Sequence, residues 1–251
     1  MSVPSLLPYL LALGDDALVL GHRLSEWCGH APVLEEDVAL ANLALDLIGQ
    51  AQLFYTYAGE IEGKGRDADA FAYLRDVRDF RNVLLVEQPN GDFAVTTMRQ
   101  LLDAAFICPY YGALMSSADA RLAAIAAKAV KEMAYHRRHA AEWTIRLGDG
   151  TAESHTRTAA ALDELWPYTG ELFEMDDDER ALAAQGIAVD REGLRAAWRA
   201  AISDVLTRAT LVVPSDRWMQ SGGRRGRHSE HLGHMLAAMQ VLQRTYPGAV
   251  W

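Results

Sequence analysis

The chain has 251 residues, half of them apolar, so it can bury a large core, and its length is near the upper end of what one core supports. Acidic residues (34) outnumber basic ones (24), and the net charge of −10 argues against nucleic acid or an anionic membrane surface as the main partner. We therefore expect a single domain that covers residues 1–251.

Two long helices are predicted at the start of the chain. Leucines recur at helical spacing from residue 5, and Gly29 and Pro32 end the segment, which predicts a helix over 5–28. A second helix is predicted over 35–60, where the acidic residues 35–37 suit the positive end of the helix dipole. Its centre is apolar almost all round, so we expect it to be buried on most sides.

Both helices carry polar residues at helical spacing. His22 and Glu26 could meet on one face of the first helix, as a surface ion pair or as part of a site. Asn42, Asp46 and Gln50 form a polar row in the second helix, and a buried polar group without a partner costs about 1–3 kcal/mol. A hydrogen-bonded seam between helices would supply those partners.

A loop is predicted after residue 62, followed by a segment, residues 73–82, whose arginines and aspartates are expected to pair among themselves. The turn at 88–92 precedes a helix over 93–115, which carries Asp103 on its apolar side and should kink at Pro109. A fourth long helix is predicted over 119–147. These four helices are the predicted core.

The remainder, 151–251, is predicted to be a helical extension. Helices are expected over 151–174, with a bend at Pro167, over 192–209, and from Ser229 as N-cap to Arg244. The acidic run 176–179 reads as a solvated loop or a helix start. No strand pattern is visible, so the predicted class is all-α.

The fourth helix nearly contains a metal-binding pattern. A Glu-x-x-His pair places a carboxylate and an imidazole on one helix face, as in di-iron helical bundles, but Met133 stands three residues before His136. The available carboxylate, Glu132, points about 100° away. With Glu26 and Asp103 on other helices, the residues leave open a metal site, a site that has lost its metal, or an ordinary core helix.

Two further patterns could carry chemistry. His228, His231 and His234 are spaced by three, but i and i+6 lie about 240° apart on a helix, so surface or interface histidines are the favoured interpretation. The loop with Arg224, Arg225 and Arg227 could bind phosphate or an acidic partner, although a flexible, solvated loop is the simpler interpretation.

Five segments in order along the chain resemble the non-catalytic C subunits of bacterial phenylacetyl-CoA 1,2-epoxidases. They are Ser25-Glu-Trp-Cys-Gly-His-Ala-Pro32, Leu43-Ala-Leu-Asp-Leu-Ile-Gly-Gln-Ala51, Leu85-Val-Glu-Gln-Pro-Asn-Gly91, Lys131-Glu-Met-Ala-Tyr-His136 and Gly222-Gly-Arg-Arg-Gly-Arg-His-Ser-Glu-His-Leu-Gly233. The resemblance implies a ferritin-like four-helix bundle with additional C-terminal helices.

The resemblance also implies a partner, a homologous catalytic subunit whose di-iron centre epoxidises the aromatic ring. Asp46 matches an aspartate of that subunit, and Glu26, Asp103 and His136 match iron ligands. The remaining ligand positions fall on Leu47, Gln50 and Met133. Because leucine and methionine cannot coordinate a hard iron ion, the resemblance implies no metal, no cofactor and no catalytic residue in this chain, with Glu26, Asp103 and His136 as a buried hydrogen-bonded network.

The implied complex is a cytoplasmic hetero-oligomer with small accessory subunits and a reductase that carries flavin and iron–sulfur groups, and it uses NADPH and O₂. Five tryptophans are candidate interface anchors: Trp27, Trp166, Trp198, Trp218 and Trp251. The two cysteines, Cys28 and Cys108, are expected to be buried thiols in a reducing compartment. No signal peptide and no membrane-spanning apolar run is predicted.

Two alternatives remain. One is a stand-alone metal-dependent oxidoreductase that uses His136, Glu132 and neighbouring carboxylates. The other is a structural or ligand-binding helical bundle outside any oxygenase complex. Metal content distinguishes the first alternative from a metal-free member of an oxygenase complex.

Overall fold

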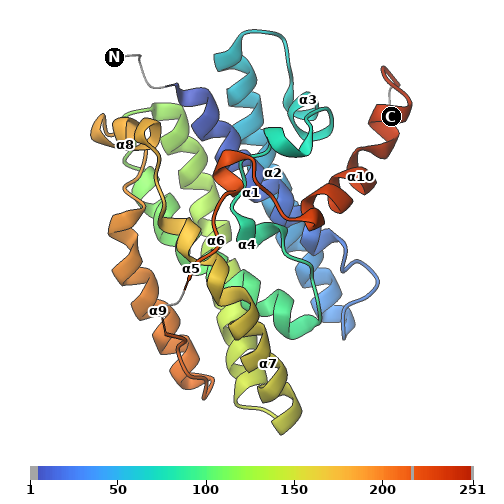
Figure 1. The fold of residues 1–251 in the computed structure, drawn as a ribbon, viewed down its shortest axis with the longest axis vertical. Helices are drawn as coiled ribbons and strands as arrows, with labels where there is room; N and C mark the ends of the chain where they lie inside the picture. The colour runs from blue at the N-terminus through green and yellow to red at the C-terminus, as the bar shows by residue number, and fades with distance from the viewer. Residues whose placement is uncertain (1–4, 216–217, 250–251) are drawn as a thin grey trace. The chain divides into compact units, whose positions relative to one another are not determined.

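The protein is all-α in the residues that the computed structural model describes, 5–215 and 218–249. Within these ranges the chain forms ten α-helices and five short 3₁₀ segments and no strand (Figure 1). The predicted fold class is therefore confirmed. The four long helices expected for a ferritin-like bundle are all present: α1 (Leu6–Ser25), α2 (Leu34–Glu62), α5 (Phe93–Leu114) and α6 (Ala120–Gly148).

The chain divides into two compact units. Of the described residues, one unit contains 29–37, 90–215 and 218–220, and the other contains 5–28, 38–89 and 221–249. We call them the α5–α9 unit and the α1–α10 unit. Neither unit is a continuous stretch of chain, and a single domain over residues 1–251 stays a prediction.

Close contact between α1 and α2 organises the α1–α10 unit. A Cβ atom on Gly21 would lie 3.1 Å from Leu47 Cβ and 3.2 Å from the Ala44 carbonyl oxygen, so glycine at this position lets the two helices approach. Earlier on α1, the ring of Tyr55 lies against Gly14 in the same way.

Short helices complete this unit. The chain continues through α3 (Ala68–Tyr73), η1 (Val77–Asp79) and α4 (Leu84–Glu87), and later through η5 (Gly223–Arg225) and α10 (Glu230–Thr245). Helix α4 packs against α1, and α10 packs against α3 and η1. The sequence predicted no helix between residues 63 and 92, because one-turn helices are too short to show a periodic pattern.

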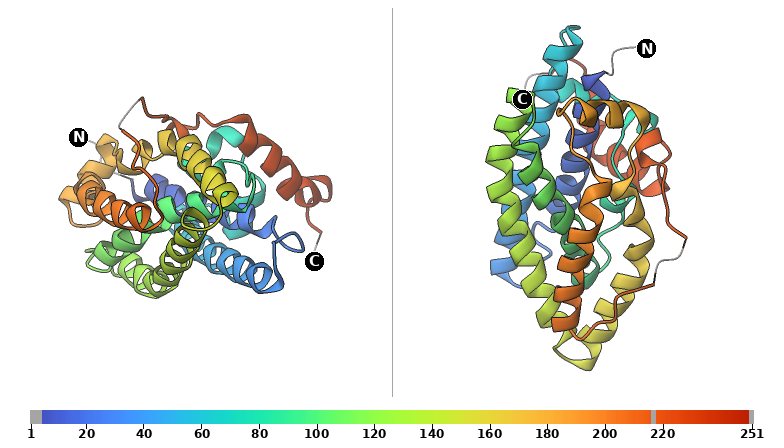
Figure 2. Two further views of the ribbon diagram at one scale, coloured as in Figure 1. Left: turned by 90° about the horizontal axis from the view of Figure 1, so that it is seen from below. Right: turned by 90° about the vertical axis from the view of Figure 1, so that its left-hand side faces the viewer.

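Helices α5 and α6 form the centre of the α5–α9 unit, where they lie side by side (Figure 2). Both begin at an aspartate N-cap: Asp92 accepts from the backbone N–H of Val95, and Asp119 accepts from that of Leu122. Helix α7 (Ala152–Leu165) packs on α5 and α6, as does α9 (Arg195–Arg208). Helix α8 (Asp177–Ala184) lies between them in the sequence.

Aromatic residues form the core of this unit at a place where the sequence predicted the last part of a helix. The helix expected over 151–174 ends at Leu165 and continues as the 3₁₀ segments η2 (Trp166–Tyr168) and η3 (Gly170–Phe173). Proline at 167 explains the break, because it fits the first turn of a 3₁₀ helix but not the interior of an α-helix. The rings of Trp166 and Trp198 lie 5.6 Å apart, and the indole N–H of Trp198 donates to the Leu102 carbonyl at 3.0 Å.

Other predicted boundaries differ by a few residues. Helix α1 ends at Ser25 instead of residue 28, and the helix expected over 192–209 begins with the 3₁₀ segment η4 (Glu192–Leu194). The acidic run after residue 175 is a helix start, since Asp176 caps α8 through the backbone N–H of Glu179 at 2.7 Å.

Helix α2 is less buried than the sequence predicted, both in its polar row and in its apolar residues. Asn42 is exposed, so the polar row is not wholly buried. Apolar side chains on the same helix are also exposed, among them Val38 (54 %), Leu45 (65 %) and Ile48 (38 %). By length and a mean hydropathy of 1.2, α2 is also the one described helix that could cross a bilayer, contrary to the sequence prediction. A core helix of a soluble protein passes the same test, so this is weak evidence for a membrane span.

Candidate functional site

Glu26 lies at the C-terminal end of α1 and is paired locally. Its carboxylate accepts from the Arg23 guanidinium at 3.0 Å, and its side chain is 36 % exposed. Burial lowers the pKa of His22, and the negative charge of Glu26 acts against this, so the two side chains do interact. The prediction of Glu26 as a buried member of a network is wrong, because its side chain is partly in solvent.

The ligand positions assigned to the second helix lie on the buried face of α2. Leu47 is 3 % exposed and packs against Gly21 of α1, and Gln50, one turn later, is 2 % exposed. Asp46 is half-buried. Apolar packing of Leu47 thus occupies the place where the resemblance assigns an iron-binding glutamate.

The ligand positions assigned to the other two helices are also buried. Asp103 of α5 is 3 % exposed, Met133 of α6 is 0 % exposed, and His136, one turn after Met133, is 1 % exposed. Glu132 is half-buried and lies on a different part of the helix surface. The sequence therefore correctly predicted that Asp103 and His136 are core residues.

The residue types at these positions do not fit a pair of iron ions. Such a centre takes mainly hard oxygen ligands with one imidazole per iron, whereas Leu47 offers no donor, Met133 offers a soft thioether and Gln50 offers a neutral amide. Within the described residues no group of three or more histidine, cysteine or acidic side chains is placed to hold a metal ion.

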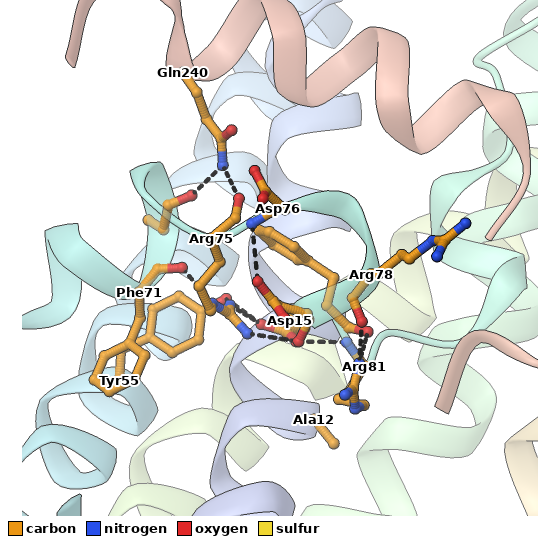
Figure 3. Close-up of polar contacts among 12 residues, drawn as sticks. Ala12, Asp15, Tyr55, Phe71, Arg75, Asp76, Arg78, Arg81 and Gln240 are labelled. Carbon is orange, nitrogen blue, oxygen red and sulfur yellow. Dashed lines mark hydrogen bonds and ion pairs between the residues drawn. The ribbon is translucent and has the colours of Figure 1, made fainter. Parts of the chain in front are cut away.

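A buried ionic cluster in the α1–α10 unit centres on Asp15 (Figure 3). Its carboxylate pairs with the Arg75 guanidinium and accepts from the Tyr55 hydroxyl at 2.5 Å and from the Arg81 backbone N–H at 2.7 Å. Burial and the charge of Asp15 raise the pKa of Tyr55 well above its usual value. Gln240 of α10 donates to the Arg75 carbonyl at 3.0 Å, which attaches the C-terminal helix to the cluster.

A second buried pair, Glu87 with His228, lies in the same unit. The ring nitrogens of His228 contact Glu87 Oε2 at 2.7 Å and the Phe80 carbonyl oxygen at 3.0 Å, and both side chains are almost fully buried. Burial alone would lower the pKa of His228, but the hydrogen bond and charge of Glu87 and the Phe80 carbonyl raise it. Glu87 also accepts from Asn82 at 2.8 Å and from the Ser229 backbone N–H at 2.6 Å.

The arginine loop is anchored by its first arginine. Arg224 donates to the carbonyls of Ala12 and Arg81 at 3.1 and 2.8 Å and forms an ion pair with Asp16 at 2.6 Å. Arg225 and Arg227 are exposed. The prediction of a flexible, solvated loop is therefore wrong for Arg224, and the prediction of a surface histidine is wrong for His228.

Comparison with known proteins agrees with the resemblance seen in the sequence. The family model described as phenylacetic acid catabolic protein matches residues 2–251. The chain belongs to this family. The C subunit of the 1,2-phenylacetyl-CoA epoxidase of Escherichia coli (strain K12) is 52 % identical to it over 243 residues, which cover 97 % of this chain and 98 % of that protein.

Membership of the phenylacetic acid catabolic protein family confirms the predicted family, and similarity to one subunit of an epoxidase favours a complex over the stand-alone metalloenzyme.

The tryptophans predicted as interface anchors differ in exposure. Trp166 and Trp198 are buried, Trp27 is half-buried, Trp218 is 75 % exposed, and Trp251 lies outside the described residues. Cys108 is buried as expected, but Cys28 is exposed.

Sequence reasoning missed the buried ionic clusters. Arg75 pairs with Asp15 and Arg244 pairs with Asp76, so the arginines and aspartates of 73–82 do not pair only among themselves. One signal was available: Asp15 and Asp16 stand in the middle of an otherwise apolar helix. Buried charges of this kind require partners, but their identity depends on contacts across roughly 60 residues of chain or more.

Proposed function

We propose that this chain is the structural, non-catalytic C subunit of a phenylacetyl-CoA epoxidase that serves aerobic phenylacetate degradation. The end-to-end similarity to the C subunit of such an epoxidase supports the assignment. The observation that carries the non-catalytic role is the packing of Leu47 against Gly21, together with the fully buried Met133, at positions where the catalytic relative needs carboxylates.

In this proposal the chain holds no metal and no cofactor, and the chemistry belongs to its partners. The oxidation takes place at the di-iron centre of a homologous catalytic subunit, and a reductase with flavin and iron–sulfur groups supplies electrons from NADPH. Small accessory subunits complete the hetero-oligomer, which we place in the cytoplasm. The remaining task of this chain is to pack against the catalytic subunit and hold it in its active form.

The exposed apolar face of α2 is our candidate for that contact. Val38, Leu45 and Ile48 follow the spacing i, i+7 and i+10, which places them along one side of the helix. Stable subunit interfaces resemble a protein core cut in half, and helix faces of this kind supply them. This face gives the supporting role a physical basis.

Co-expression with the catalytic subunit tests the proposal. The two chains are purified together as a native complex, and the iron content of the complex is measured. The chains are then separated under denaturing conditions to determine their ratio. Each chain is also prepared alone for the same iron measurement. We expect two irons for each catalytic subunit, none that is stoichiometric with this chain, and no oxygenase activity of this chain alone with phenylacetyl-CoA, NADPH and reductase.

Two results would overturn the proposal. One is stoichiometric iron in the separately purified chain, which would favour the stand-alone oxidoreductase with His136 as ligand. The other is a chain that elutes as a monomer in the presence of an equimolar, folded catalytic subunit.

A further inference from the structure

A groove in the α5–α9 unit has a volume of about 520 Å³, which lies in the range of small-molecule sites. It is lined from three helices. The floor includes Leu101 and Ala105 of α5, one turn apart, and the walls come from α6 and α9. Neither the family resemblance nor the relative assigns a ligand to it.

The walls combine small and charged side chains at a regular spacing. On α6, Ala134 and Ala141 are two turns apart with Arg137 and Arg138 between them. On α9, Ala201 and Arg208 are likewise two turns apart, with Asp204 and Val205 between them. The alanines leave a gap between the two helices, and Leu101 and Ala105 at its floor are almost fully buried.

The charge at the rim favours an anion. Three arginines and one carboxylate line the groove, although the chain as a whole has a net charge of −10. Asp204 lies 3.7 Å from Arg208, and both side chains are more than 60 % exposed, so this contact is a weak surface pair. Burial raises the pKa of Cys108, which lies one turn beyond Ala105 on α5, and the positive charge of Arg137 acts against this rise.

We propose that this groove binds a small amphipathic carboxylate. The apolar body lies against Leu101, Ala105 and Val205, and the carboxylate is held at the rim by Arg137 and Arg138. A guanidinium presents paired N–H donors that match a carboxylate, and the two arginines together can bind both oxygens. The proposal goes beyond the structural role in the epoxidase and does not depend on it.

Calorimetric titration of the full chain with octanoate, octan-1-ol and acetate separates the two parts of the ligand. We expect octanoate to saturate one site, and we expect octanol, which lacks the charge, and acetate, which lacks the apolar body, to bind at least tenfold more weakly. Titration with 4-phenylbutyrate then distinguishes an aromatic from an aliphatic body. Absence of octanoate binding, or equal affinity for octanol, would overturn the proposal.

Substitutions of the charged residues that line the groove test whether octanoate binds there. The double variant Arg137→Gln with Arg138→Gln should weaken octanoate binding at least tenfold, whereas Asp204→Asn should strengthen it by removing the one opposing charge. Arg146→Gln is the matched control, because Arg146 lies on the same helix over the Trp143 ring and does not line the groove. All four positions are exposed, so circular dichroism should show a normal fold.

Blocking the groove gives an independent result. Ala134→Trp, at an exposed helix position, should abolish octanoate binding without changing any charge. If Ala134→Trp leaves octanoate binding unchanged but prevents assembly with the catalytic subunit, the groove is a protein-docking surface and the proposal is wrong.

Discussion

At the scale of single residues, Asp15 shows how this protein holds a charge in its core. The carboxylate is 0 % exposed, yet each oxygen accepts two hydrogen bonds: Oδ1 from Tyr55 and Arg75, and Oδ2 from Arg75 and Arg81. An ionised carboxyl has about four acceptor positions, so all of them are used. A buried ion pair is tolerated when its remaining hydrogen-bonding groups are satisfied in this way.

The Asp15→Asn variant should therefore be strongly destabilised. It leaves the Arg75 guanidinium buried without its counter-charge, and breaking a buried pair by removing one partner costs about 3 kcal/mol or more. Urea denaturation followed by circular dichroism measures the change. Asp204→Asn, the same substitution in an exposed pair, should change the stability by less than about 1 kcal/mol, and equal effects of the two variants would refute this explanation.

The Glu87–His228 pair predicts a specific pH dependence. The Phe80 carbonyl can only accept, so His228 Nε2 carries a proton, and the carboxylate of Glu87 favours a second proton on Nδ1. Because the pKa of His228 is raised in the folded state, the pair contributes fully below the unfolded value of about 6.5. Its contribution is lost as the pH rises through the raised folded-state pKa.

Stability measured over a pH range that starts at about 6.5 should accordingly fall with rising pH, and His228→Gln should flatten this dependence. The charged groups that act on His228 are Glu87 of α4 and Asp15 of α1, and both are acidic, so both favour the protonated ring. The variant should be less stable than the parent at the acidic end of this range and closer to it at the alkaline end. An unchanged slope would show that another group titrates in this window.

At the scale of elements, periodicity predicted the long helices and failed at their surfaces. Four amphipathic or apolar segments gave α1, α2, α5 and α6 to within three residues at each end, because long helices repeat their pattern many times. The same pattern did not reveal that α2 has an exposed apolar side. An apolar helix face is predicted to be buried, and the pattern does not tell whether the helix that covers it belongs to the same chain or to another chain.

The long-range contacts of the candidate site were beyond sequence reasoning for a different reason. The resemblance was enough to predict that Leu47, Gln50 and Met133 stand at the positions of iron ligands, because each position follows from the spacing along one helix. By contrast, the pairs Asp15–Arg75 and Glu87–His228 join residues 60 and 141 positions apart, and no local pattern encodes them.

The exposed face of α2 gives a prediction at this scale. Leu45→Glu should weaken co-purification with the catalytic subunit at least tenfold and should change the stability of the isolated chain little, since Leu45 is 65 % exposed. Pull-down with the tagged catalytic subunit measures the effect. Val212→Glu, a similar change at an 86 % exposed apolar residue in a loop, should leave assembly intact, and loss of assembly in both variants would remove α2 as the contact.

At the scale of the whole molecule, the C-terminal stretch closes the α1–α10 unit. Its described residues are 5–28, 38–89 and 221–249, so the ribosome makes its last part after all the others. Arg224 pairs with Asp16, His228 with Glu87, and Gln240 donates to backbone carbonyls of Ala72 and Arg75. The C-terminal residues thus supply polar partners for buried groups of the earlier segments.

A chain truncated after Gln220 should for this reason fail to form a stable fold. The truncation takes away the charged partners of two buried carboxylates, Asp16 and Glu87. Breaking a buried ion pair by removing one partner costs about 3–5 kcal/mol, so the two losses together are comparable to the whole stability of a domain. A chain truncated after Thr245, the last residue of α10, keeps all of these contacts and is the control. Solubility and thermal unfolding by circular dichroism compare the two. A cooperative transition near that of the full chain in the shorter variant would show that the unit is complete without its C-terminal stretch, and the buried pairs would then have to be regarded as dispensable.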